Sequence, residues 1–302
     1  MGGRLAHYMV ERGHFVTLGT RKQRKTPDWL VNGRVAIADW EDGCSLEDMC
    51  RGIDVLIHSA GMNASDCEAD PIAALEFSGL ATSRLIEAAH IVGVRRFIYL
   101  STAHVYSRRL VGMISENKAP QNTHPYASSN LAAENVVLYA NELGKMEGYI
   151  LRLSNVIGAP MDLGANCWSL VVNDLCRQVV SKGEMVLDST GLQQRDFLAM
   201  RSLCSTVDAF CSKSSDVLEQ GLYNVGSEKS MSVFEVAQLI QRRCKRMLGF
   251  SPSIKRQQAK SELVSASLRY SCQKVEDAGI YIESSLDREV DELLAFSKAT
   301  FI

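Results

Sequence analysis

RFIYLSTAHVY occupies residues 96–106 of the chain, and HPYASSNLAAE occupies residues 124–134. The first stretch opens with an apolar run that is typical of a buried strand, and Thr102 stands where that strand would end. The second stretch leads into a predicted helix and holds Tyr126 and Asn130, four residues apart.

The first half of the chain alternates short apolar runs with longer helical patterns. Continuous apolar runs of this length are typical of strands that are buried on both faces. Separated by helices, they predict a parallel sheet with helices on both sides, which is an α/β fold. The predicted strands are residues 14–19, 33–38, 54–58, 96–100 and 148–153, and the predicted helices are residues 71–92 and 128–143.

The second half of the chain is less regular. No internal repeat and no low-complexity linker separates it from the first half. With 302 residues the chain can bury a large core, so one main domain with a smaller satellite is expected. The predicted helices of this half are residues 168–180 and 232–244, and its predicted strands are residues 185–187 and 223–226.

Composition and charge argue against several classes of function. The net charge is −2 with both signs mixed along the chain, which gives no reason to expect binding to nucleic acid or to an anionic membrane. No apolar run reaches the roughly 18 residues that span a bilayer, and no signal-peptide pattern opens the chain. The nine cysteines form no Cys-x-x-Cys pair. We therefore expect a cytoplasmic protein with reduced thiols and no metal site.

The spacing of Thr102, Tyr126 and the helix that follows them resembles the active site of the extended short-chain dehydrogenases/reductases, the NAD(P)-dependent sugar epimerase/dehydratase family. Other segments are similar to landmarks of that family, and they follow in the family's order. These segments are residues 152–158, 194–197 and 223–227.

The resemblance implies a Rossmann-like, doubly wound parallel sheet with a smaller C-terminal substrate-binding part. Residues 1–160 would form the dinucleotide-binding domain. Residues 161–302 would mostly bind the substrate, with residues 223–226 returning to the main sheet.

The resemblance also implies roles for the three residues of the predicted site. Thr102 would orient the substrate oxygen, and Tyr126 would exchange the proton while hydride moves between the nicotinamide and the substrate. In the family a Lys four residues after the Tyr lowers the pKa of the phenol and holds the nicotinamide ribose, but here this residue is Asn130. A nearby unit charge shifts a pKa by about one to three units. Without that charge, alcohol oxidation should suffer more than carbonyl reduction, because only oxidation needs the phenolate. Complete loss of activity is the alternative.

The start of the chain also departs from the resembling family. Residues 1–12 form a predicted helix that stops at Gly13. In the family this helix follows a strand and a Gly-x-x-Gly-x-x-Gly loop, whose glycines let backbone N–H groups approach the pyrophosphate. Gly2 corresponds to the last of those glycines, so the first strand and two glycines, roughly ten residues, are expected to be missing. A start codon assigned too far downstream would explain this, and a natural truncation is the alternative.

The end of the predicted strand at residues 14–19 bears on the type of cofactor. NAD-preferring folds carry an acid there for the ribose 2′-OH, whereas an Arg accommodates a 2′-phosphate. This chain has Thr20, Arg21 and Lys22 and no acid, which favours NADP(H) over NAD. The resemblance implies further cofactor contacts directly after the predicted strands at residues 33–38 and 54–58 and at the start of the first helix. These positions are Asp39, Trp40, Ser59, Ala60, Gly61 and Gly2.

Asn155 and Arg195 match family positions that contact the phosphates or the base of a nucleotide-sugar. Arginine suits a diphosphate because its fork binds two oxygens at once. An ion pair of Arg195 with Asp196 or with another carboxylate is the alternative role. The dehydratase branch of the family carries an Asp-Glu pair directly after the Ser/Thr. Here those positions are Ala103 and His104, so a 4,6-dehydratase is disfavoured.

We therefore predict an NAD(P)-dependent oxidoreductase or epimerase that acts on a nucleotide-sugar or a related carbonyl or hydroxyl compound, with NADP(H) and reduction favoured. One alternative is a catalytically silent cofactor-binding sensor or scaffold of the same fold. Another is a hydroxysteroid- or flavonoid-type reductase of the same superfamily. A homodimer is compatible with all three.

Overall fold

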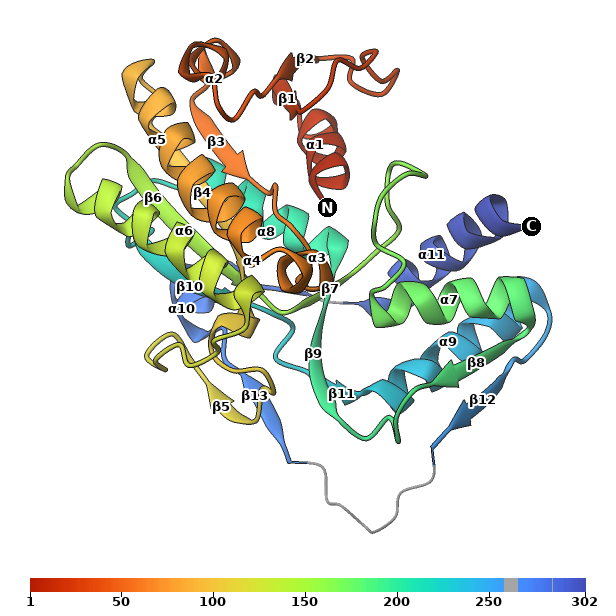
Figure 1. The fold of residues 1–302 in the computed structure, drawn as a ribbon. Coiled ribbons are helices and arrows are strands. Elements are labelled where there is room, and N and C mark those ends of the chain that lie inside the picture. Colours follow the sequence, from red (N-terminus) through yellow and green to blue (C-terminus); the bar gives the residue numbers. More distant parts are fainter. Residues whose placement is uncertain (258–265, 284) are drawn as a thin grey trace.

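The computed structural model describes residues 1–257, 266–283 and 285–302. It confirms the predicted α/β fold with a parallel sheet, but the sheet is broken into two pieces (Figure 1). Every strand pair within the two pieces is parallel. The smaller piece pairs β1 (Val16–Thr20) with β2 (Gly33–Ile37), and the larger has the order β10 (Gly221–Val225), β6 (Glu147–Leu153), β4 (Arg96–Thr102) and β3 (Val55–His58).

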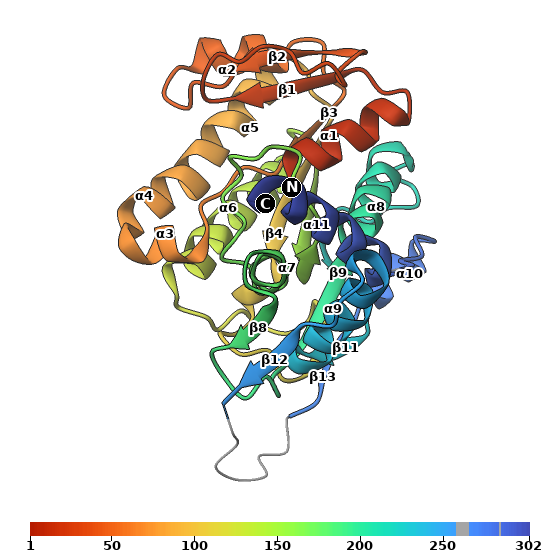
Figure 2. The same cartoon turned by 90° about the vertical axis from the view of Figure 1, so that its right-hand side faces the viewer.

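Helices cover both faces of the larger piece, as Figures 1 and 2 show. Side chains of neighbouring strand residues alternate between the faces, as the pleat of a strand requires. One face of the sheet packs Ile98 and Tyr149 against α1 (Gly2–Glu11) and α8 (Met200–Ser212). The other packs Phe97, Tyr99 and Ile150 against α2 (Gly43–Cys50), α5 (Ala81–Ile91) and α6 (Pro125–Glu142).

Most of the second half of the chain builds a separate core at the end of the molecule opposite β1 and β2 (Figures 1 and 2). Its helices are α7 (Val171–Lys182), α9 (Val233–Leu248) and α11 (Leu286–Phe301). Three small sheets belong wholly or partly to this half of the chain. In the first, β9 (Gln194–Ala199) lies between β7 (Asn155–Ile157) and β11 (Ser230–Ser232), and the second pairs β8 (Glu184–Leu187) with β12 (Ser253–Arg256). The third pairs β5 (Gly112–Ile114) of the first half with β13 (Leu268–Tyr270).

Three predicted helices have different bounds in the structure. The helix predicted from residue 128 begins at Pro125, where proline's fixed φ suits the first turn. The helix predicted over residues 168–180 begins only at Val171. The helix predicted over residues 71–92 is not continuous, because a π-helical turn interrupts it. Its parts are α4 (Pro71–Leu75), η1 (Glu76–Leu80) and α5. The remaining short helices of the described residues are α3 (Ala64–Ala69), η2 (Ala103–Val105) and α10 (Gln273–Asp277).

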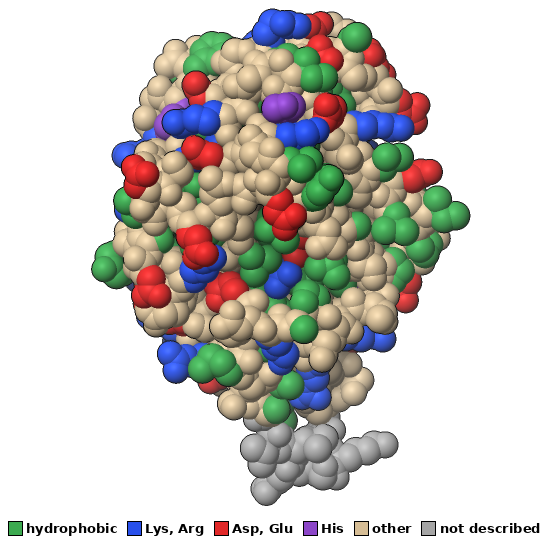
Figure 3. Space-filling model, turned by 90° about the vertical axis from the view of Figure 1, so that its left-hand side faces the viewer, with side chains coloured by type: hydrophobic (Ala, Val, Ile, Leu, Met, Phe, Trp, Pro, Cys, Tyr) green, Lys and Arg blue, Asp and Glu red, His purple; other side chains and the backbone are tan. Residues whose placement is uncertain are grey.

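The surface shows no segregation of charge on the face that α5 and α6 cover, where side chains of both signs lie interspersed (Figure 3). Within the described ranges, no helix combines the length and the apolar character needed to cross a membrane.

A buried ion pair ties α6 to the sheet beneath it. Arg152 of β6 meets Glu134 of α6 through two nitrogens, with Nη2–Oε2 and Nε–Oε1 distances of 2.6 and 3.0 Å. Ser101 donates a further hydrogen bond to the same carboxylate, and the guanidinium lies 4.6 Å from the ring centre of Tyr106. Glu134 and Arg152 are almost wholly shielded from solvent. Removing either partner would therefore leave a buried charge without a counter-charge.

We predict that Glu134→Gln lowers the free energy of unfolding by about 3–5 kcal/mol, because Arg152 loses its counter-ion in the core. Glu142→Gln, which removes an exposed carboxylate from the same helix, should change it by less than about 0.5 kcal/mol. Urea unfolding at neutral pH measures both. The double variant Glu134→Gln/Arg152→Met should recover much of the loss, since no unpaired charge remains. Equal stability of Glu134→Gln and Glu142→Gln would contradict the interpretation.

Candidate active site

The end of β4 and the start of α6 bring two hydroxyl groups together. Thr102 ends β4, and its oxygen accepts a hydrogen bond from the backbone N–H of His104 at 3.2 Å. Tyr126 lies in the first turn of α6, and its N–H donates to Nδ1 of His124 at 3.2 Å. With both backbones fixed in this way, the Thr102 hydroxyl lies close enough to the phenol of Tyr126 to lower the pKa of that phenol.

Asn130 lies one helical turn after Tyr126, and both ends of its amide have partners. Its Oδ1 accepts from the hydroxyl of Tyr99 at 2.9 Å, and its Nδ2 donates to the backbone carbonyl of Tyr126 at 2.7 Å. The residue is only 9% exposed. The amide therefore holds the first turn of α6 and a neighbouring strand, whereas a lysine at this position would carry a charge.

Tyr99 is a site residue that the sequence analysis did not identify. The pleat of β4 places Tyr99 and Ser101 on the same face of the strand, and both donate to side chains of α6. The alternation along the predicted strand was the signal that could have paired Tyr99 with the helix.

Burial makes the phenol of Tyr126 harder to ionise. Desolvation raises the pKa of this phenol above its usual value, and the nearby hydroxyl of Thr102 offsets this only in part. Desolvation also raises the pKa of Tyr99 well above its usual range. Both phenols are therefore neutral near pH 7. Tyr126 is prepared to donate a proton, while acting as a base would first require ionisation at high pH.

An aromatic cluster follows the end of β2 and contains a hydrogen-bond donor without a partner among the described residues. Trp40 packs against His58 and Phe77, with ring centres 5.7 and 5.5 Å apart. Its indole Nε1 is buried and has no hydrogen-bond partner among the described residues. Because buried donors are nearly always paired, an acceptor on a ligand would satisfy it. Asp39 is exposed, and its carboxylate accepts from the N–H of Glu41 at 3.0 Å.

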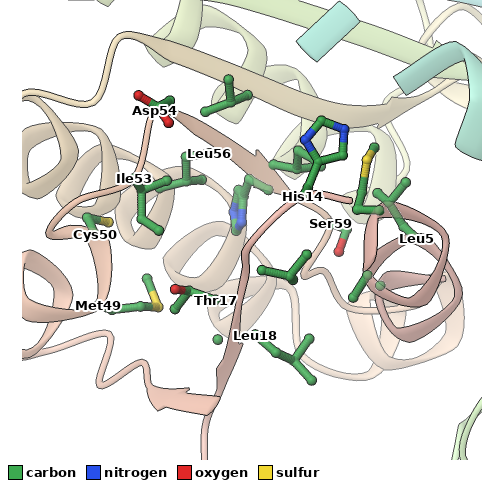
Figure 4. Close-up of a pocket in the computed structure, with 18 of the residues that line it drawn as sticks. Leu5, His14, Thr17, Leu18, Met49, Cys50, Ile53, Asp54, Leu56 and Ser59 are labelled. Atoms are coloured by element: carbon green, nitrogen blue, oxygen red, sulfur yellow. The ribbon is translucent and has the colours of Figure 1, made fainter. Parts of the chain in front are cut away.

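Close packing joins the start of α1 to the end of β3. A Cβ at Gly2 would lie 2.9 Å from Oγ of Ser59, so a glycine permits this approach. α1 begins without a side-chain cap and without an acid in its first turn, which leaves its N–H groups for a negatively charged group. Gly2, Trp40, Ser59 and Ala60 line one pocket of about 570 Å³ (Figure 4), and Gly61 follows as an exposed residue outside this lining.

The three residues predicted to select the cofactor lie where β1 ends and the chain turns towards solvent. The hydroxyl of Thr20 donates to the backbone carbonyl of Lys22 at 2.8 Å, which fixes the turn. Arg21 and Lys22 are exposed, and neither forms an ion pair with a described residue. Two free cations therefore stand at the strand end where a 2′-phosphate would need them.

A second pocket, of about 740 Å³, contains the predicted substrate residues. Asn155 and Arg195 both line it, and Asn155 donates to the backbone carbonyl of Asp196 at 2.9 Å. The described residues form no ion pair between Arg195 and Asp196, whose carboxylate accepts from Ser227 instead. Burial lowers the pKa of Arg195, as expected for a guanidinium that lacks a counter-charge.

Two further arginines of this pocket were not identified from the sequence. Arg108 and Arg109 follow η2 in an exposed loop and line the pocket beside His104. All the charged or titratable side chains in the described lining are thus Arg or His. An adjacent pair of arginines with no carboxylate nearby in sequence was the available signal, but a loop conformation cannot be derived from residue spacing.

Most of the predicted cofactor residues fit a dinucleotide. The unpaired indole N–H of Trp40, the small residues at Gly2 and Ser59 and the free cations of Arg21 and Lys22 suit its adenosine and phosphate groups. Asn130 fits less well, because both ends of its amide are already engaged.

Comparison with known proteins identifies a family for most of the chain. Residues 1–226 match the family model described as "NAD dependent epimerase/dehydratase family". A dTDP-D-glucose 4,6-dehydratase of Bos taurus is 34% identical over 197 residues, which cover 63% of this chain and 52% of the bovine protein. The chain thus spans about half the length of this curated relative.

Solved structures with similar folds contain either form of the cofactor. RMD from Pseudomonas aeruginosa complexed with NADPH has a TM-score of 0.71 at 22% identity, covering 88% of this chain and 90% of its own. The UDP-glucose 4-epimerase of Thermus thermophilus in complex with NAD has a TM-score of 0.78 at 18% identity, covering 98% and 95%. At these identities the likeness establishes the fold alone.

The wall of the first pocket generates a prediction about pH. His58 is 3% exposed, its Nε2 lies 3.1 Å from Oγ1 of Thr82, and burial lowers its pKa to about 4. The native state therefore does not bind a proton that the unfolded state accepts below about pH 6.5. The contribution of neutral His58 to stability is complete above about pH 6.5 and declines as the pH falls towards 4.

We expect the wild type to lose about 3 kcal/mol of unfolding free energy between pH 7 and pH 4 through His58. His58→Gln, which keeps a polar partner for Thr82, should remove that part of the pH dependence. His90→Gln, at an exposed histidine, should leave it in place. Urea unfolding across this pH range tests the prediction, and parallel curves for wild type and His58→Gln would refute it.

Proposed function

Because the chain belongs to the NAD-dependent epimerase/dehydratase family, we propose that it is an NADP(H)-linked oxidoreductase or epimerase that acts on a nucleotide-sugar, with carbonyl reduction favoured. The observation that carries the proposal is the placement of the Thr102 hydroxyl close to the buried phenol of Tyr126, together with a pocket that three arginines and His104 line. Similar proteins whose names include a nucleotide-sugar, such as the bovine dTDP-D-glucose 4,6-dehydratase, support this substrate class.

The charges of the second pocket support a diphosphate over an apolar substrate. Arg108, Arg109 and Arg195 line it without a carboxylate among the described lining residues. Arginine binds phosphate oxygens in pairs, and a partly buried guanidinium gains more from such a pair than an exposed one. A hydroxysteroid or a flavonoid offers no group for three guanidinium charges. The pocket therefore favours a nucleotide-sugar.

The residues after Thr102 argue against the elimination of water. Ala103 and His104 provide no carboxylate where the dehydratase branch carries its Asp-Glu pair. Burial, and next the charge of Arg195, lower the pKa of His104, so its imidazole is neutral near pH 7. We infer that the chain performs oxidoreduction or epimerisation, although its bovine relative is named a dehydratase.

A bound nicotinamide would supply or accept the hydride. Tyr126 would give its proton to the substrate oxygen as a carbonyl is reduced, and Thr102 would hold that oxygen through its hydroxyl. The neutral state of the phenol suits this direction, because the proton is present before the reaction begins. The reverse direction would need a phenolate that neither Asn130 nor Tyr99 helps to form.

A catalytically silent cofactor-binding protein is the second candidate. The amide of Asn130 is engaged by Tyr99 and by the carbonyl of Tyr126, which is a stable structural arrangement without a catalytic charge. This observation favours a protein that retains its cofactor site but does not catalyse a reaction.

The first prediction from the proposal concerns cofactor choice. NADPH should bind more tightly than NADH, and Arg21→Ala should narrow that preference by about tenfold or more, because a charge-assisted hydrogen bond is lost. Lys25→Ala removes the same charge further along the same exposed loop and should leave the preference unchanged. Calorimetric titration of both cofactors measures this. Tighter binding of NADH by the wild type, or equal effects of the two variants, would contradict the choice of NADP(H).

The second prediction concerns the missing lysine. The wild type should reduce carbonyls near neutral pH and oxidise alcohols only at high pH. Asn130→Lys should move the alkaline limb of the oxidation profile down by about one to three pH units, because the added charge stabilises the phenolate. The measurement is kcat/KM against pH in both directions, with a panel of nucleotide-sugars and saturating cofactor.

Tyr126→Phe is the control for this experiment and should abolish both directions. Tyr99→Phe releases Asn130 without adding charge and should not shift the profile. An Asn130→Lys profile that overlays the wild type would show that position 130 does not govern the phenol. A wild type without turnover, together with activity in Asn130→Lys, would identify the silent protein.

A further inference from the structure

The pocket that Asn155 and Arg195 line has two walls from different parts of the chain. One wall comes from β7 and β9, which pair as parallel strands of one small sheet. The other wall is the loop between η2 and β5, which contributes residues 108–111. β13, which pairs with β5, lies beside β9 (Figure 1). The pocket, of about 740 Å³, therefore lies between the C-terminal part of the chain and a loop that follows the candidate active site.

Contacts within this loop fix the backbone of Arg108 and Arg109. The hydroxyl of Ser107 donates to the backbone carbonyl of Arg109 at 2.9 Å. Leu110, directly after the two arginines, is 8% exposed and packs in a buried cluster with Leu268 of β13. A fixed backbone reduces the conformational entropy that the two arginine side chains lose when they bind a ligand.

The guanidinium groups of this loop have no counter-charge among the described residues. Arg108 and Arg109 are exposed, and neither side chain forms an ion pair or a hydrogen bond with a described residue. Arg256 beside the pocket is engaged differently, because its Nη1 donates to the carbonyl of Thr190 at 3.2 Å and its guanidinium lies 4.0 Å from the ring centre of Phe234. The two arginines of the loop are thus available to a ligand.

The positive charge of the pocket exceeds what the diphosphate of a nucleotide-sugar would neutralise. Arg108, Arg109 and Arg195 are charged, whereas His104 is neutral near pH 7 because burial, and next the charge of Arg195, lower its pKa. A diphosphate linkage is a dianion, so it balances two of the three guanidinium groups. No carboxylate from the described lining residues balances the third. The pocket is therefore complementary to a ligand with one acidic group beyond its diphosphate.

The connection of this loop to the candidate active site bears on which part of the ligand carries that group. η2 starts directly after Thr102, and the N–H of His104 donates to Oγ1 of Thr102 at 3.2 Å. The carbonyl of His104 accepts from Nδ2 of Asn122 at 2.7 Å, which holds η2 against the segment before α6. His104 lines the same pocket as Arg108 and Arg109. This connection to Thr102 favours a group on the reacting sugar over one on the nucleoside.

We propose that Arg108 and Arg109 select a nucleotide-sugar whose sugar carries a carboxylate, as a hexuronate does. A guanidinium binds both oxygens of a carboxylate at once, whereas the neutral hydroxymethyl group of a hexose offers no such pair. The inference rests on the proposed nucleotide-sugar substrate, with the diphosphate bound by Arg195 and the carboxylate bound by the loop. It concerns recognition and is independent of the direction in which hydride moves.

Calorimetric titration with matched sugars in the presence of NADP⁺ tests the proposal. UDP-glucose and UDP-glucuronate differ only at the sixth carbon of the sugar, and dTDP-glucose and dTDP-glucuronate form the same pair on the other pyrimidine. The glucuronate of a pair should bind about tenfold or more tightly than the glucose, because charge-assisted hydrogen bonds are added. The double variant Arg108→Gln/Arg109→Gln should reduce this preference to about threefold or less. Arg269→Gln, which removes an exposed charge next to the lining residue Leu268, should leave the preference unchanged.

One further variant separates this inference from the proposed function. Arg195→Gln should weaken the binding of both sugars of a pair by a similar factor, since both carry the diphosphate. Equal affinities for glucose and glucuronate would overturn the carboxylate proposal, while the proposed nucleotide-sugar function would remain. A preference that Arg269→Gln removes as fully as the double variant would also overturn the proposal, because general attraction between charges would then explain it. Binding of none of the four sugars would overturn the proposed function and this inference together.

Discussion

The buried pair of Arg152 and Glu134 is the interaction on which the geometry of the candidate active site depends. Glu134 lies about two turns along α6 from Tyr126, and Arg152 lies on the strand that pairs with β4. Ser101, which donates to the same carboxylate, is the neighbour of Thr102. A shift of α6 along the sheet would separate a buried charge from its partner. The resulting loss of folding free energy is larger than most new contacts could offset. Because the buried ion pair fixes α6 against the sheet, the hydroxyls of Thr102 and Tyr126 stay close to each other.

The same helix face explains why the site lacks a cation. Tyr126, Asn130 and Glu134 follow one another at four-residue spacing, so all three point towards the sheet. Glu134 already has its cation in Arg152, and Asn130 has its donor in Tyr99. The polar groups beneath Tyr126 are thus satisfied without a free charge. Burial is then the largest influence on the pKa of the phenol, and burial favours its protonated form.

The sequence predicted those helices and strands whose apolar residues recur in a strong local pattern. The apolar runs predicted every strand of the two main sheet pieces. Parallel strands that are buried on both faces have continuous apolar sequences, which are easy to recognise. α8 was missed because its serine, threonine and cysteine residues are poor helix formers, and tertiary packing decides its structure. In the site, Thr102 and Tyr126 could be paired from spacing. The direction of the Asn130 amide could not, because it depends on Tyr99 across the interface, and the loop of Arg108 and Arg109 has no periodicity at all.

The start of α1 depends on contacts with the C-terminal part of the chain. Arg4 donates to Glu292 of α11 at 3.0 Å and to the carbonyl of Ala159 at 3.3 Å. Partly exposed ion pairs contribute little to stability, so they restrain this end of the helix only weakly. Any change that moves α11 should therefore reach the start of α1 before it reaches Thr102 and Tyr126, which lie on elements joined by the buried pair of Arg152 and Glu134.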